Sequence, residues 1–147
     1  MISNRTKIGF LAFVSGLLLT AGTVLSDGWP PSVEGTWNVV GANTEGTLTI
    51  TQGAGASGST SKPIRGQIYK TDNIEGFYNP SSGRIAFIRF DRKSSSAKQF
   101  FCGNLTQYAA GKALRIGGTM TVFRHDGTKG TIGGSLGEYN FSAIKSK

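Results

Sequence analysis

The most reactive side chains of this chain are one thiol and one imidazole, because Cys102 and His125 are the only Cys and the only His in 147 residues. A single Cys excludes an intrachain disulfide and a Cys-rich zinc site, and a single His excludes a cluster of His ligands. Nucleophilic catalysis needs a base within hydrogen-bonding reach of the nucleophile, and nothing in the pattern orients this pair. We therefore expect Cys102 to be a small buried residue of a strand, and we expect no enzyme and no metal or other cofactor. Turnover that depends on Cys102 or His125 would be needed to support catalysis.

A glycine-rich segment at residues 53–58 has the spacing G-x-G-x-x-G. The dinucleotide-binding motif of this spacing also needs a helix that opens at its third glycine, inside a βαβ unit. Here the sequence continues with residues 59–63, Ser-Thr-Ser-Lys-Pro, which do not favour a helix. We interpret the segment as a flexible hairpin loop, and a mobile lid over a ligand is a hypothesis for it.

The N-terminus resembles an export signal, with Arg5 and Lys7 before an apolar run over residues 8–25 and small residues up to Ser26. We predict a signal peptide over residues 1–26, a linker over 27–34 and a β-barrel domain over 35–147. The protein is then secreted or periplasmic, with an uncleaved membrane anchor as the alternative. No Cys follows the apolar run, so a bacterial lipoprotein is not indicated.

Positive charge is abundant but scattered. The chain has 16 Lys and Arg; without Arg5 and Lys7, 14 remain against eight Asp and Glu, a net charge of +6. A nucleic-acid site would favour a basic stripe interleaved with exposed aromatic residues. The densest basic run, residues 89–93, is followed by three serines, and we interpret it as a solvated hairpin tip. We expect no nucleic-acid partner.

Beyond residue 32 the chain alternates between apolar and polar residues with period two, and no long window keeps a helical spacing. Leu114, Ile116, Met120 and Val122 share one parity, for example, and turn residues separate the runs. The alternation predicts eight strands: 35–40, 46–52, 63–69, 73–79, 84–91, 98–107, 113–124 and 135–145.

Short connections between these strands favour antiparallel neighbours, and therefore an all-β, eight-stranded antiparallel up-and-down barrel. A barrel of this size can be filled by side chains or can hold one small ligand. A two-sheet sandwich is the structural alternative. Glycines inside the expected strands, such as Gly66, Gly76 and Gly118, indicate tight coiling or close backbone approach.

Several ordered motifs together resemble the avidin/streptavidin family, and the opening Gly-Thr-Trp also resembles lipocalin-type barrels. The matching segments, in order, are 35–37 (GTW), 64–69 (IRGQIY), 74–78 (IEGFY), 101–105 (FCGNL), 115–122 and 136–141 (LGEYNF). The resemblance spans residues 35–145 and implies a barrel that binds a small molecule at one open end. Each motif by itself is weak, because Gly-x-aromatic sequences are common in β proteins.

The same comparison predicts that biotin is not bound tightly. Phe101 and Met120 stand where the family has Trp residues that enclose biotin, and Tyr139 stands where it has an Asp. Each polar group of a ligand that is buried without its partner costs about 1–3 kcal/mol, so several such losses abolish tight binding. Sub-micromolar binding of biotin by calorimetry would contradict this prediction.

Positions that match the family's ligand site suggest a different lining, apolar with a few convergent polar groups. The candidate ligand-binding residues are Val39, Asn43, Ile68, Lys70, Gln99, Phe101, Met120 and Tyr139. Lys70 and Gln99 would suit a ligand that carries a carboxylate or a carbonyl. A packed core with polar residues at its rim is the alternative for the same positions.

Three classes of function follow, with an exported barrel that binds an unknown small molecule or peptide as the first. The second is an extracellular protein-interaction barrel such as a protease inhibitor, which would use the segment 27–31. Some metalloprotease inhibitors resemble this arrangement, although a single Cys cannot form their disulfide. An enzyme is the third. The expected strand 84–91 is apolar on both faces, so a homo-oligomer through this strand is a further hypothesis.

Overall fold

The computed structural model describes residues 29–93, 96–106, 113–125 and 129–147. The expected signal segment 1–26 and residues 27 and 28 lie outside this part of the chain. The described residues form eight antiparallel strands. Among them there is no helix that is long and apolar enough to cross a membrane. The strands are β1 (Gly35–Gly41), β2 (Thr44–Gln52), β3 (Lys62–Ile68), β4 (Asp72–Asn79), β5 (Arg84–Phe90), β6 (Ala97–Thr106), β7 (Arg115–Phe123) and β8 (Ser135–Lys145).

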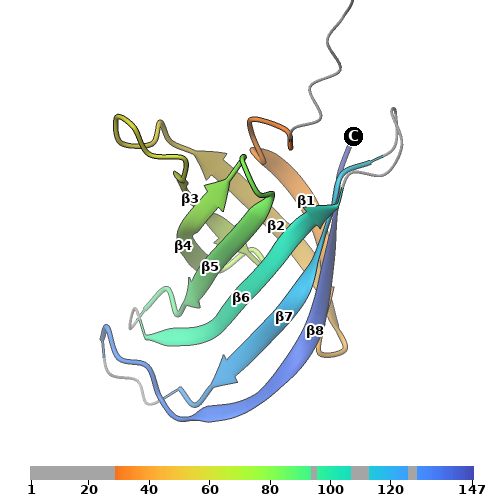
Figure 1. Cartoon of the computed structure of the whole chain (residues 1–147). Helices are drawn as coiled ribbons and strands as arrows, with labels where there is room; N and C mark the ends of the chain where they lie inside the picture. The colour runs from red at the N-terminus through yellow and green to blue at the C-terminus, as the bar shows by residue number, and fades with distance from the viewer. Residues whose placement is uncertain (1–28, 94–95, 107–112, 126–128) are drawn as a thin grey trace, which may run out of the picture.

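Each strand pairs with its neighbour in sequence, and β1 pairs with β8, so the sheet closes into an up-and-down barrel (Figure 1). The expected barrel is confirmed, and the sandwich alternative is wrong. Closure leaves no free sheet edge to pair with other chains. The strand bounds differ from the expected ones by two residues at most.

Alternation along the strands places the apolar side chains inside, as expected. Trp37, Leu48, Ile85 and Phe101 are among the side chains that are fully buried in one core cluster. Glycines allow the strong curvature that closure requires. A Cβ added at Gly76 would collide with the backbone of Ala86 and Phe87 on β5. The expectation of close backbone approach is therefore confirmed at this position.

The two ends of the barrel differ. We call the end at which β1, β3, β5 and β7 begin the plugged end, because residues 29–34, the strap, close it. Val33 of the strap is fully buried, and the Nε1–H of Trp37 donates a hydrogen bond of 3.0 Å to its carbonyl oxygen. The Tyr78 hydroxyl donates to the Pro30 carbonyl at 2.7 Å. The C-terminal part of the expected linker is thus attached to the barrel.

The loop at residues 53–61 connects β2 to β3, and it therefore lies at the plugged end. Gln52, directly before this loop, accepts a hydrogen bond from the Val33 amide and donates one to the Pro31 carbonyl. The opposite end, at which β1, β3, β5 and β7 finish, is called the mouth. The glycine-rich loop therefore lies at the opposite end of the barrel from the mouth, and its action as a mobile lid over a ligand stays a prediction.

Candidate functional site

Three aromatic rings fill the centre of the barrel below the mouth. The rings of Phe87 and Phe101 are stacked with centroids 4.7 Å apart, and Phe141 meets Phe101 edge to face at 5.1 Å. All three side chains are buried. Because inward-facing residues recur every second position, the next layer toward the mouth holds Arg89, Gln99 and Tyr139, two residues along each strand. The polar layer thus lies directly on an aromatic floor.

Asp72 anchors this polar layer. It begins β4 on the inward-facing side, with its side chain 5% exposed. Its Oδ2 accepts hydrogen bonds from Arg89 Nε at 2.8 Å and from Lys98 Nζ at 3.1 Å, and Arg89 Nη2 lies 2.7 Å away. Arg89 Nη1 also donates to Gln99 Oε1 at 2.8 Å. A buried carboxylate is tolerated here because two cations and their hydrogen bonds compensate for its lost hydration.

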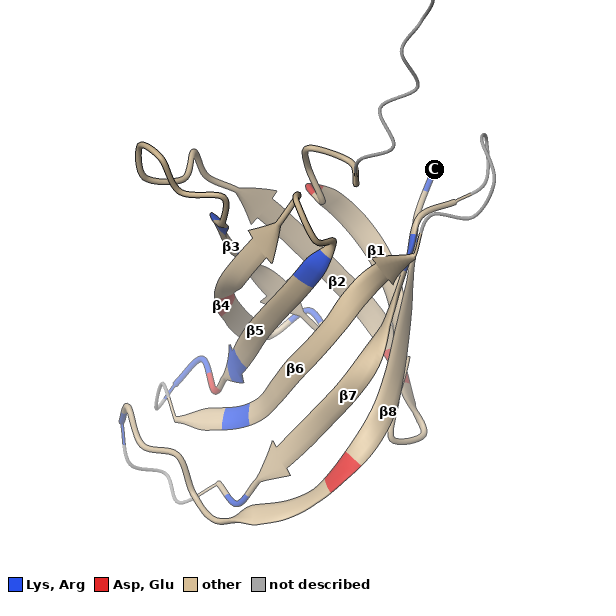
Figure 2. Cartoon of the chain, viewed as in Figure 1, with Lys and Arg blue, Asp and Glu red and all other residues tan. Residues whose placement is uncertain are grey.

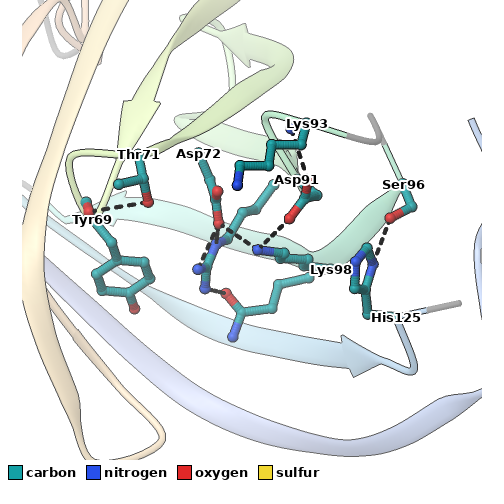
Figure 3. Close-up of polar contacts among 10 residues, drawn as sticks. Tyr69, Thr71, Asp72, Asp91, Lys93, Ser96, Lys98 and His125 are labelled. Carbon is teal, nitrogen blue, oxygen red and sulfur yellow. Dashed lines mark hydrogen bonds and ion pairs between the residues drawn. The ribbon is translucent and has the colours of Figure 1, made fainter. Parts of the chain in front are cut away.

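Lys98 enters this layer because of a β-bulge. Arg89 pairs with Gln99, but the next residue, Phe90, pairs with Ala97, so Lys98 is the extra residue of β6. With strict alternation Lys98 would point outward, opposite to Gln99. The bulge instead lets its ammonium contact both Asp72 and Asp91, the latter at 2.9 Å (Figure 3). Burial alone would lower the pKa of Lys98, but hydrogen bonds to and charges on Asp91 and Asp72 outweigh burial and raise it.

Two tyrosines are part of the same end. The Arg89 guanidinium lies 4.6 Å from the centre of the Tyr69 ring, in a cation–π contact. Burial raises the pKa of the Tyr69 hydroxyl, and the charge of Arg89 opposes this shift. Tyr139 faces inward by its alternation with buried Phe141, yet it is 44% exposed. Tyr139 is therefore accessible to solvent at the mouth, unlike the buried aromatic residues beneath it.

Cys102 and His125, the two reactive side chains, have separate surroundings. The Cys102 thiol lies on the outer face of β6, where Arg84 Nη2 contacts its sulfur at 3.3 Å. It is half-buried, so the expectation of a buried thiol is corrected: alternation with Phe101 turns it outward. His125 follows β7, and its Nδ1 lies 2.6 Å from the hydroxyl of buried Ser96.

Four of the predicted ligand residues are core residues: Val39, Ile68, Phe101 and Met120 are at most 1% exposed. They pack in the central cluster, and a ligand would reach them only if the core opened. For these positions the structure has the arrangement of the stated alternative, a packed core beneath a polar rim. Their contact with a ligand stays a prediction.

The other four predicted residues lie at the mouth. Gln99 is hydrogen-bonded to Arg89, and Tyr139 faces the opening. Asn43 and Lys70 are exposed residues of the turns that follow β1 and β3, and both adopt positive φ angles, 61° and 67°. The structure thus places these four at one end of the barrel, and their contact with a ligand stays a prediction.

Asp72, Arg89 and Lys98 were not among the predicted site residues. The basic run at residues 89–93 was expected to be a solvated tip, which holds for the exposed Arg92 and Lys93. It is wrong for Arg89, whose side chain is 18% exposed and points inward. The available signal was parity: Arg89 alternates in phase with Ile85 and Phe87, and Asp72 with Ile74. Charged residues in phase with a core indicate a buried polar layer.

Within the described ranges, no group of three His, Cys, Asp or Glu residues could hold a metal ion. Comparison with protein-family models, curated proteins and solved structures finds no match for this chain.

Proposed function

We propose that this protein is an exported binding barrel of avidin-like type that takes a small ligand at its mouth. The observation that supports this most is the contrast between the two ends. The plugged end is filled by Val33 and Trp37, whereas the mouth exposes the inward-facing ring of Tyr139 beside Arg89 and Gln99. Open ends of small barrels with a few convergent polar groups are common ligand sites.

The chemistry of the mouth favours a ligand with an apolar or aromatic body and an anionic or carbonyl group. Tyr69 and Tyr139 supply the aromatic surface of the mouth, whereas Phe101 and Phe141 are buried beneath the polar layer. Lys98 and Gln99 are the partly exposed donors of this layer. Because Asp72 and Asp91 compensate the charges of Arg89 and Lys98, a ligand anion competes with carboxylates already in place. We therefore infer that the mouth binds an anionic ligand with moderate affinity, and that the shape of the ligand provides most of the specificity.

Native mass spectrometry of residues 27–147, prepared from an exported fraction, tests this proposal beside the denatured mass. We expect additional non-covalent mass that identifies the ligand by its difference. Biotin, added as a probe, is expected not to bind tightly. A bare protein mass in every preparation would contradict a retained ligand.

Two variants with similar surface exposure locate the site. Tyr139→Ala removes an aromatic ring at the mouth that is 44% exposed, and Phe77→Ala removes one on the outer face of β4 that is 41% exposed. We expect the additional mass to be lost in the first variant and kept in the second. Loss in both, or in neither, would remove the mouth from consideration.

A second proposal, a homo-oligomer, rests on the outer face of β5. The outward-facing Ile88 and Phe90 are partly exposed, whereas the outward-facing Ala86 is already covered within the single chain, at 4% exposure. Trp29, the alternative cover for this face, packs on the core cluster beside Gly83. An apolar outer face of this kind fits a second copy of the chain. A strictly monomeric mass at high protein concentration would contradict this proposal.

A further inference from the structure

Two exposed aliphatic side chains lie near the connection between β7 and β8, Ile132 in the connection and Leu136 at the start of β8. Ile132 is 61% and Leu136 is 55% exposed, the two highest values among the large exposed hydrophobic residues of the described chain. Both lie at the mouth end, and Figure 1 shows this connection as the lower left extremity of the barrel. Large apolar side chains exposed within a few residues of each other in the sequence are a candidate contact surface.

Positive charge surrounds the same two side chains. Arg124 and Lys129 belong to the same connection, and both are exposed. Arg92 and Lys93 are exposed in the neighbouring connection between β5 and β6, and Figure 2 shows this end of the barrel with its blue residues. Among the described residues, the exposed acid nearest in the sequence to this connection is Glu138 on β8, and Asp126 of the same connection lies outside the described residues. The result is a surface that combines aliphatic groups with cations.

Backbone hydrogen bonds hold this connection against the barrel. The Arg124 amide donates to the Gly134 carbonyl at 2.8 Å, and the Ala97 amide donates to the Thr131 carbonyl at 3.0 Å. Ile132 also forms a parallel bridge with Ala97 at the start of β6. The aliphatic side chains therefore project from a backbone that the barrel positions. We call Arg124, Lys129, Ile132 and Leu136 together the tip.

We propose that the tip docks the mouth of the barrel onto an anionic lipid surface. Cations attract anionic headgroups, and aliphatic side chains enter the interface without the shape complementarity that a protein partner demands. A stable protein interface normally needs a large, well-packed patch with aromatic or Arg anchors at its buried centre. The tip instead offers two separate aliphatic groups on a glycine-rich segment. Docking does not depend on the proposed ligand, because Ile132 and Leu136 are outside the ligand layer.

Vesicle flotation tests this proposal with residues 27–147, which contain the whole barrel without the apolar run of residues 8–25. Vesicles of phosphatidylglycerol mixed with phosphatidylcholine are compared with vesicles of phosphatidylcholine alone, at low and at high salt. We expect the protein to float with the anionic vesicles at low salt and to be released at high salt. Failure to float with anionic vesicles, or equal binding to both kinds, would overturn the proposal.

Variants separate the two contributions. Near an anionic membrane each Lys or Arg contributes about fivefold to the partition coefficient, so Arg124→Ala with Lys129→Ala should weaken binding about 25-fold. Ile132→Ser with Leu136→Ser should weaken it at least about tenfold, because aliphatic area no longer enters the interface. Unchanged binding of either double variant would also overturn the proposal.

Matched controls carry the same substitutions elsewhere. Val40→Ser with Ile144→Ser changes two exposed aliphatic residues of the β1–β8 surface, 45% and 38% exposed. Arg115→Ala with Lys147→Ala removes two exposed cations at the plugged end. Both controls should bind anionic vesicles as the unchanged protein does, and equal losses in a control and a tip variant would show non-specific charge or surface effects. Circular dichroism verifies that every variant is folded.

Discussion

At the plugged end and at the mouth of this barrel, polar side chains find their hydrogen-bond partners in different ways. At the plugged end, Trp37, Tyr78 and Gln52 satisfy their polar groups on the backbone of the strap, so a segment of the chain itself excludes water. At the mouth, Arg89 and Lys98 donate their hydrogen bonds to the carboxylate of Asp72. No segment of the described residues covers the mouth as the strap covers the plugged end. Apolar packing at the plugged end contributes to the stability of the fold. The partly exposed ion cluster at the mouth contributes little net stability, and its cations can exchange a carboxylate for an anionic group of a ligand.

The largest effect should come from the plugged end. Trp37→Ala removes a fully buried ring and its hydrogen bond to Val33, so we expect a loss of about 4 kcal/mol in the free energy of unfolding. Urea unfolding at neutral pH measures this loss. A loss below about 1 kcal/mol would mean that the strap, and not the ring, closes this end.

The mouth should show strong coupling instead. Asp72→Ala leaves Arg89 and Lys98 without their buried carboxylate, and we expect a loss of about 3 kcal/mol. A double-mutant cycle compares Asp72→Leu, Arg89→Leu and the variant that carries both. Because the double variant removes both partners, it should lose less than the sum of these two single variants. Additive losses in this double-mutant cycle would contradict the coupling between the two groups.

A smaller effect, with a pH signature, should come from the strap. Tyr78→Phe removes the hydrogen bond to Pro30, and we expect a loss of about 1–2 kcal/mol. Burial raises the pKa of Tyr78 to about 12 from 10.0, so its contribution is fully present below pH 10 and is lost as the pH rises toward 12. The difference in unfolding free energy between the two proteins should therefore shrink over this range. A constant difference would show that the hydroxyl does not titrate differently in the folded state.

The smallest effect should come from Tyr139, although it occupies an inward-facing position like Trp37. Because its ring is 44% exposed, Tyr139→Ala should change the unfolding free energy by less than about 1 kcal/mol. A loss as large as that of Trp37→Ala would mean that the mouth is packed as tightly as the plugged end. The mouth would then have no room for the proposed ligand. Urea unfolding of the two variants in parallel makes this comparison.

Much of the barrel follows from local sequence patterns. Alternation such as Leu114, Ile116, Met120 and Val122, with short turns between the runs, was sufficient for eight strands, their order and their inward faces. These features are local, since side-chain direction reverses at every residue of a strand and short connections bring sequence neighbours together. The positions of Gln99 and Tyr139 at the mouth followed from the same alternation and from the family resemblance.

The charged layer was decided only by tertiary structure. Asp72, Arg89 and Lys98 are up to 26 residues apart, and their contact depends on the register of β4, β5 and β6. The bulge at Lys98 reverses the direction that alternation predicts for this side chain, and no local sequence pattern predicted the bulge. The closed end likewise depended on the strap reaching Tyr78, 48 residues further along the chain from Pro30. Alternation determines which way a side chain points, whereas register and bulges determine which side chains meet.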